Sequence, residues 1–368
     1  MIVESRRRKM NASLMTIFLL VALQTLFFFQ PSYCLSDSHV DNQSKNVQKY
    51  VAEDIDELHY NSVLIVSQKK HEGYFNKIQD AINAIPNNNI DLVLIRVMPG
   101  IYREQVIIPV DKPYIILSGY NANNTVITWN DNAEASGTYS CATLTIFASD
   151  FVARYITIEN SYEEPNGNPI AAVAIRVSGD RSAFYNCRFL GYQDTVLDDS
   201  GRHYFKNCFI QGGVDFICGN GQSLYEKCHL HTIPRQNGAI AAQRRNASGE
   251  ATGFVFLNCK VTGGGLMYLG RAWGYYSRVI FAFTYMDDII FPEGWNDWND
   301  PTRQKLVIFG QYKCFGPGSN IEKRVSWAYN ELSDDEAAPF ITISFVNGER
   351  WIHRTPIPPA LKKEKNHF

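Results

Sequence analysis

Residues 184–220 read FYNCRFLGYQDTVLDDSGRHYFKNCFIQGGVDFICGN, and this stretch contains one short pattern twice. The segment around Cys187 returns around Cys208, which lies 208 − 187 = 21 residues later. Asp194 and Asp215 each follow their cysteine by seven residues. Repetition at a period near 20 residues, carried by short runs of β-branched and aromatic residues, indicates stacked coils of β-strands. The two aspartates therefore occupy equivalent places in consecutive coils.

Further copies of the pattern surround Cys228 and Cys259. Equivalent positions on adjacent coils lie about 4.8 Å apart, so the repeat predicts that Asp194 and Asp215 lie side by side. Two carboxylates at that distance do not both ionise easily, which raises the pKa of one and leaves a proton donor beside a charged carboxylate. The alternative is that each aspartate only ends a strand or stabilises a turn.

The remaining sequence predicts strand after strand, separated by Gly, Asn, Asp and Pro. One amphipathic helix is predicted over residues 78–85, where it would cap the end of the stack. The fold class is all-β, a right-handed single-stranded parallel β-helix with that short N-terminal capping helix and a C-terminal extension; a β-sandwich is the alternative. Strands are expected at residues 63–66, 93–97, 105–108, 114–117, 126–129, 144–147, 155–158 and 173–177, with a helical turn in 325–340 and a last strand at 341–346.

The N-terminus is typical of a secretory signal, with basic residues at 6–9 and an apolar run at 14–29. We expect cleavage after residue 34, although a signal anchor is the alternative. Residues 35–60 then form a mobile segment, 61–356 the β-helix domain and 357–368 a charged tail. The mature chain would be secreted, with no membrane attachment.

Removal of the signal changes the formal charge from −2 to −2 − 3 = −5, which argues against nucleic-acid binding. Arg244 and Arg245 remain local candidates for contact with an acidic polymer.

Seven cysteines remain after removal of the signal, which is an odd number. The cysteines of the repeat either stack as small inward-facing hydrophobes or form disulfides. No spacing of Cys or His suggests a metal, and no cofactor is expected. Acceptor patterns for glycosylation occur at Asn42, Asn123 and Asn246.

Several blocks of this sequence resemble the signature blocks of plant pectin methylesterases, in the same order. They are GYFNKIQDAINAIP (73–86), PGIYRE (99–104), AVAIRVSGD (172–180), GYQDTV (191–196), GGVDFICGN (212–220), LGRAW (269–273), PEGW (292–295) and FGPG (315–318). The similarity runs from about residue 63 to 351 and is to the short type without an inhibitor-like pro-region. It implies an esterase of the plant cell wall that converts methylated homogalacturonan to pectate and methanol.

The resemblance also implies roles for individual residues. Asp215 would be the nucleophile, Asp194 the general acid and then the general base, and Gln193 an amide donor to the oxyanion. Arg271 would hold Asp215 ionised and contact the substrate carboxylate. Three aromatic side chains would line the substrate cleft, although core packing is the default for any tryptophan: Trp273, Trp295 and Tyr139. We expect a monomer whose partners are pectin and a proteinaceous inhibitor.

Three positions depart from the family pattern. Ala171 stands where a second oxyanion glutamine is expected, Leu197 where a cleft tyrosine is usual, and Cys218 where a phenylalanine is usual. These changes leave a weakly active or inactive pectin-binding protein as the alternative function. Paired carboxylates also suit cleavage of glycosidic bonds, so a β-helix glycoside hydrolase or lyase is a second alternative.

Overall fold

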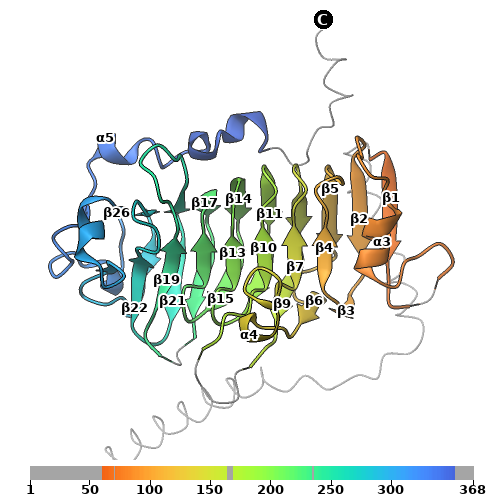
Figure 1. Cartoon of the computed structure of the whole chain (residues 1–368), viewed down its shortest axis with the longest axis horizontal. Coiled ribbons are helices and arrows are strands. Elements are labelled where there is room, and N and C mark those ends of the chain that lie inside the picture. The colour runs from red at the N-terminus through yellow and green to blue at the C-terminus, as the bar shows by residue number, and fades with distance from the viewer. Residues whose placement is uncertain (1–59, 70, 164–168, 234–235, 353–368) are drawn as a thin grey trace, which may run out of the picture. The chain divides into compact units, whose positions relative to one another are not determined.

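The chain winds into a right-handed parallel β-helix, in which successive strands pass in turn through three parallel sheets (Figure 1). The computed structural model describes residues 60–69, 71–163, 169–233 and 236–352. The predicted β-helix is confirmed. The predicted signal, the N-terminal segment up to residue 59, the charged tail and the acceptor site at Asn42 lie outside the described residues.

The three sheets are named A, B and C, in the order in which the chain visits them. Sheet A contains, from one edge to the other, β1 (Ser62–Val66), β2 (Val93–Val97), β5 (Ile115–Gly119), β8 (Val152–Arg154), β11 (Ser182–Tyr185), β14 (Arg202–Lys206), β17 (Gln222–Glu226), β20 (Gly253–Leu257), β23 (Arg278–Ala282) and β26 (Ile308–Tyr312).

Sheets B and C have eight strands each. Sheet B contains β3 (Gly100–Arg103), β6 (Thr125–Trp129), β9 (Thr157–Asn160), β12 (Arg188–Leu190), β15 (Phe209–Gly212), β18 (His229–Thr232), β21 (Lys260–Gly263) and β24 (Tyr285–Met286). Sheet C contains β4 (Val106–Ile108), β7 (Leu144–Ile146), β10 (Ile175–Val177), β13 (Val196–Asp198), β16 (Ile217–Gly219), β19 (Gly238–Gln243), β22 (Met267–Arg271) and β25 (Trp295–Asn296). Every strand predicted up to residue 177 overlaps an observed one.

Helices are few and short. The predicted capping helix is α3 (Ile78–Ala84), whose apolar face packs against β1, β2 and β4. The Glu104 carboxylate accepts hydrogen bonds from the backbone N–H groups of Ile78 (2.8 Å) and Gln79 (3.1 Å), so a negative charge lies at the N-terminus of α3. The others are α4 (Ala133–Ser136), α5 (Asp334–Ala337) and the 3₁₀ segments Pro301–Lys305, Pro317–Ser319, Ile343–Val346 and Gly348–Arg350.

The repeated sequence pattern builds the core as ladders of like side chains. Aromatic rings from consecutive coils stack at 4.6 Å (Phe184 on Phe205), 4.4 Å (Phe205 on Tyr225), 4.9 Å (Tyr225 on Phe256) and 4.5 Å (Phe256 on Phe281). These offset stacks bury large apolar surfaces and fix the register of neighbouring coils.

The repeat cysteines form a second ladder, and their thiols are free. Cys208, Cys228 and Cys259 are buried, and each places its sulfur 3.2–3.6 Å from a backbone carbonyl oxygen in the preceding coil. The residue before each repeat cysteine, including Cys187, adopts a left-handed backbone conformation, which asparagine tolerates well: three of the four are asparagines, at 186, 207 and 258, and the fourth is Lys227. Of the two alternatives for these cysteines, the stacked arrangement is the observed one.

The C-terminal extension covers the outer face of sheet A (Figure 1). The predicted helical turn is α5, which begins with a capping box between Ser333 and Glu336. The predicted last strand at 341–346 is wrong, because Ile343–Val346 is a 3₁₀ segment packed across β14 and β17. Its Phe345 and Val346 are both buried, which an alternating strand on that surface would not allow.

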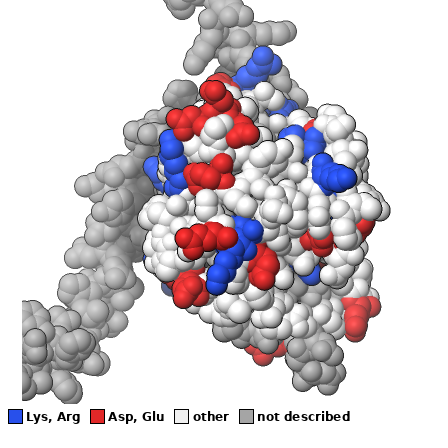
Figure 2. Space-filling model, turned by 90° about the vertical axis from the view of Figure 1, so that its left-hand side faces the viewer, with Lys and Arg blue, Asp and Glu red and all other residues white. Residues whose placement is uncertain are grey.

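At the C-terminal end of the β-helix, where β26 and α5 lie, acidic and basic side chains are interspersed with uncharged surface (Figure 2). Such a mixed surface has no single sign with which to attract a polyanion. Within the described residues, none of the helices has the length and apolar character needed to cross a bilayer.

Candidate active site

Asp194 and Asp215 lie in equivalent turns between sheets B and C. Asp194 lies between β12 and β13, and Asp215 lies one coil later between β15 and β16. Both adopt left-handed backbone conformations, with φ of 58° and 46°. The Asp194 N–H donates to the carbonyl of Val214 at 3.1 Å, so the two turns are hydrogen-bonded together. The structure thus brings together the two carboxylates that the repeat predicts.

Arg271 ends β22 and reaches Asp215 from two coils away. Its Nε donates to Asp215 Oδ1 at 2.9 Å, and its Nη2 donates to Asp215 Oδ2. Asp215 is only 5% exposed, so this bidentate pair holds the carboxylate in one orientation. Arg271 itself lies over the ring of Trp298, with Cζ 4.5 Å from the centroid. Trp298 lies in a loop just beyond β25, and no sequence motif predicts its place at the site.

The environments of the two carboxyl groups differ. Burial and the charge of Asp215 raise the pKa of Asp194 to about 8, and the charge of Arg271 opposes this. Burial also raises the pKa of Asp215, but there the hydrogen bond and charge of Arg271 act directly against the shift. Asp194 is therefore the carboxyl group that keeps its proton at neutral pH, and Asp215 is the one whose ionised form has a cation bound to it.

Gln193 precedes Asp194 and forms parallel bridges with Ala171 on one side and Val214 on the other. Ala171 thus occupies the place next to Gln193, in the preceding coil. A glutamine at that place would put a second amide beside the first. The methyl group of Ala171 supplies no donor, so the departure noted in the sequence lies directly at the site.

Two of the three aromatic residues predicted to line the cleft, Trp273 and Tyr139, are partly exposed near Arg271 and Arg244. Trp273 is half-buried two residues after Arg271 and packs on a small apolar cluster of Cys141, Ala142, Val173, Leu197, Cys218 and Ala242. Tyr139 is 38% exposed, and its hydroxyl accepts a hydrogen bond from Arg244 Nη1 at 2.7 Å. Leu197 and Cys218 are almost fully buried in the cluster, so they form a floor beneath the tryptophans rather than a groove surface.

Trp295 is not in the cleft. It is 1% exposed and stacks on Phe309 in the core, with ring centroids 4.8 Å apart. Its register explains this position: Trp295 pairs with Gly270, whereas Asn296 pairs with the outward-facing Arg271. Alternate residues of a strand face opposite sides, so Trp295 points inward. Trp295 therefore does not line the surface beside Arg271, contrary to the prediction from the sequence.

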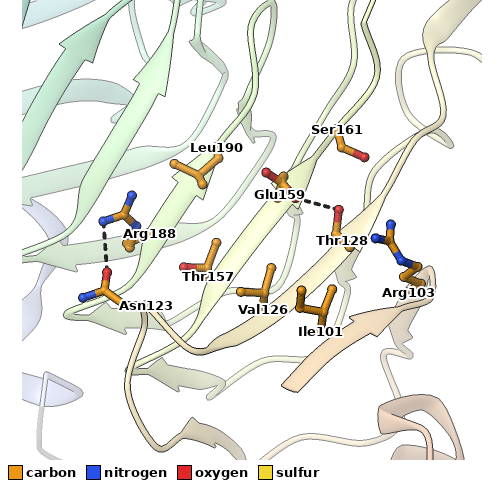
Figure 3. Close-up of a pocket in the computed structure, with 10 residues that line it drawn as sticks. All are labelled: Ile101, Arg103, Asn123, Val126, Thr128, Thr157, Glu159, Ser161, Arg188 and Leu190. Atoms are coloured by element: carbon orange, nitrogen blue, oxygen red, sulfur yellow. Dashed lines mark hydrogen bonds between the residues drawn. The ribbon is translucent and has the colours of Figure 1, made fainter. Parts of the chain in front are cut away.

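A separate pocket of about 360 Å³ lies on sheet B, away from the two aspartates (Figure 3). Within it Thr128 donates to Glu159 at 2.8 Å, and Arg188 donates to Asn123 at 3.1 Å. None of the predicted site residues lines this pocket. Among the described residues there is also no group of three or more His, Cys, Asp or Glu suited to a metal ion.

Known proteins resemble this chain over most of its length. The family model "Pectinesterase" matches residues 64–349. Pectinesterase QRT1 of Arabidopsis thaliana is 44% identical over 299 residues, which cover 78% of this chain and 78% of that protein. Pectinesterase 31 of Arabidopsis thaliana is 45% identical over 292 residues, covering 76% and 90%.

Solved structures show the same architecture. Pectin methylesterase from carrot superposes with a TM-score of 0.75 and 30% identity, covering 82% of this chain and 99% of that one. Pectin methylesterase PemA from Erwinia chrysanthemi gives a TM-score of 0.69 at 27% identity, covering 82% and 100%. The chain belongs to the pectinesterase family, and it is a carboxylic-ester hydrolase.

Proposed function

We propose that this protein demethylates pectin through an acyl-enzyme formed on Asp215. The observation that carries the proposal is the asymmetry of the pair: Asp194 and Asp215 lie in adjacent, equivalent turns, and only Asp215 is bound by Arg271. One carboxylate is thereby oriented as a nucleophile, while its neighbour retains a proton to give away. A related pectin methylesterase has been solved in complex with a hexasaccharide, which supports a polymeric substrate.

In the proposed reaction, an Asp215 carboxylate oxygen attacks the carbonyl carbon of a galacturonate methyl ester. The bond from that carbon to the methoxy oxygen breaks, Asp194 donates its proton to the departing oxygen, and methanol leaves. The product is a mixed anhydride on Asp215. Asp194, now ionised, takes a proton from water as the resulting hydroxide attacks the substrate carbonyl. Asp215 is released, the polymer keeps a free carboxyl group, and Asp194 is protonated again.

Gln193 is proposed to stabilise the oxyanion that forms in both steps, because its amide precedes the acid directly and belongs to the same turn. Trp273 and Trp298 are proposed to line the substrate groove beside Arg271, with Tyr139 further along it. The protein is proposed to act as a secreted monomer in the plant cell wall, where a proteinaceous inhibitor would bind over the groove.

Product analysis tests the reaction class. With highly methylated pectin, the esterase predicts release of methanol while the length of the polymer, measured by size-exclusion chromatography, stays constant. Shortened chains without methanol would instead identify cleavage of glycosidic bonds.

We expect the activity to fall on the alkaline side as Asp194 loses its proton. Its pKa of about 8 means that the acid form needed for methanol departure predominates below that pH and declines above it. The value of kcat/KM, measured from pH 5 to 10 with subtraction of spontaneous ester hydrolysis, should fall by about tenfold per pH unit above that value. A profile that continues to rise through pH 10 would contradict the assignment of Asp194 as the acid.

Ala171→Gln tests whether the oxyanion site is incomplete. A second amide donor beside Gln193 should raise kcat by about tenfold or more, since a single oxyanion donor is typically worth about 100-fold or more. Ala171→Leu, which adds similar bulk without a donor, is the matched control and should not raise kcat. If wild type is inactive and Ala171→Gln releases methanol, the natural chain is a decayed esterase whose role is binding.

A further inference from the structure

Arg244 lies beside the proposed groove and is held in place by two aromatic side chains. It follows β19, and its backbone N–H donates to the Gly219 carbonyl at 2.7 Å. Its guanidinium Cζ lies 5.1 Å from the ring centroid of Trp273, and its Nη1 donates to the Tyr139 hydroxyl at 2.7 Å. Stacking and one hydrogen bond thus orient a guanidinium whose side chain is still 35% exposed.

Arg244 shares its neighbouring carboxylate with a second arginine, Arg176. Asp199 is the neighbouring carboxylate, and its Oδ2 accepts hydrogen bonds from Arg176 Nε (3.2 Å), Arg176 Nη2 (2.9 Å) and Ser178 (2.9 Å). Arg244 Nη2 is 3.8 Å from Asp199 Oδ1, beyond hydrogen-bonding distance. Two guanidinium groups therefore share one carboxylate, and that carboxylate is bound chiefly by Arg176.

Register relates this cluster to the nucleophile. Arg176, Leu197, Cys218, Ala242 and Arg271 pair in one row across sheet C. Arg271 ends the row, and its Nε and Nη2 are both bound to Asp215. The three residues between the arginines are uncharged, and Trp273 packs over them. Arg244 stacks on Trp273, and its partly exposed guanidinium remains accessible beside this row.

We propose that Arg244 binds the free carboxylate of an already demethylated galacturonate unit near the reacting ester. A guanidinium forms bidentate hydrogen bonds to a carboxylate, whereas a methyl ester offers no charge to it. Arg244 would thus favour partly demethylated chains and promote further demethylation next to existing free acids. The substrate class in this inference rests on the proposed pectin esterase function.

Binding of a demethylated galacturonate hexamer, measured by isothermal titration calorimetry, tests the inference without requiring turnover. Arg244→Gln should bind the hexamer about tenfold more weakly than wild type, since a charge-assisted pair is lost. Arg188→Gln is the matched control: it removes the same charge from an arginine stacked on Phe209 at 4.8 Å, but on sheet B. Its affinity should equal that of wild type. Equal affinities for wild type and Arg244→Gln, or equal losses in both variants, would overturn the inference.

Kinetics separate this inference from the proposed function. For Arg244→Gln, kcat/KM on partly demethylated pectin should fall about tenfold through KM, while kcat/KM on highly methylated pectin changes less than about twofold. Absence of methanol release from wild type would overturn the proposed function; equal effects on both pectins would overturn only the role of Arg244. If Arg244→Gln does not fold, Arg244→Lys replaces it. That variant should bind the hexamer about threefold more weakly than wild type, and unchanged binding would overturn the inference.

Discussion

Replacing Asp215 by asparagine is expected to reduce kcat for methanol release by at least about 10⁴-fold. An amide oxygen does not form the anhydride, and no other carboxylate in the site is bound by Arg271. The substitution keeps the shape of the side chain and one acceptor for the guanidinium, so the loss should appear in kcat rather than in folding. Circular dichroism and thermal unfolding check that the variant remains folded.

Asp150→Asn is the matched control for this prediction. Asp150 also adopts a left-handed conformation, with φ of 57°, and it also pairs with an arginine, accepting from Arg181 Nε at 2.8 Å and Nη2 at 2.5 Å. It lies two residues before the sheet A strand β8 and is not among the proposed site residues. Asp150→Asn should retain the wild-type kcat, and a loss comparable to that of Asp215→Asn would show that turnover depends on such ion pairs generally.

Replacing Asp194 by asparagine should reduce activity and stabilise the fold at neutral and alkaline pH. The loss in kcat/KM is expected to be about 10²- to 10⁴-fold, the usual worth of a general acid. In the unfolded chain Asp194 ionises near its ordinary pKa of 3.8, whereas in the folded chain it holds its proton up to about pH 8. Between these values the folded state binds more protons than the unfolded state, so the stability contributed by this group falls as pH rises.

Asparagine does not carry that pH-dependent cost. The free energy of unfolding of Asp194→Asn should therefore exceed that of wild type by an amount that grows from pH 4 to pH 8. At pH 8 the gain should be on the order of a few kcal/mol. Urea unfolding at pH 5 and pH 8 measures it. A variant that is less stable than wild type at pH 8 would contradict the inferred protonation of Asp194.

Much of the fold and the central pair follow from one sequence regularity. The recurrence around Cys187 and Cys208 fixes the length of a coil, and that length alone places Asp194 beside Asp215. Arg271 is different, because the loop at residues 244–252, between β19 and β20, lengthens the coil before its strand and breaks the period. Only the resemblance to a family predicts its place at Asp215, which its two hydrogen bonds to that carboxylate support.

Two predictions fail because sequence patterns do not specify what a side chain packs against. The resemblance of its motif predicts Trp295 in the cleft, but pairing with Gly270 turns its side chain into the core. Trp298, three residues later, lies under Arg271 and had no sequence signal of its own. The segment at 341–346 has a strand-like composition, yet sheet A already ends at β26 and the segment packs across that sheet. Composition does not specify which face or which partner a residue finds.

Methanol release from highly methylated pectin at pH 7, measured side by side for wild type, Asp215→Asn and Asp150→Asn, tests whether Asp215 is the nucleophile. We expect steady release by wild type and Asp150→Asn, with polymer length unchanged, and none detectable from Asp215→Asn. Release by Asp215→Asn at a rate near that of wild type would contradict it.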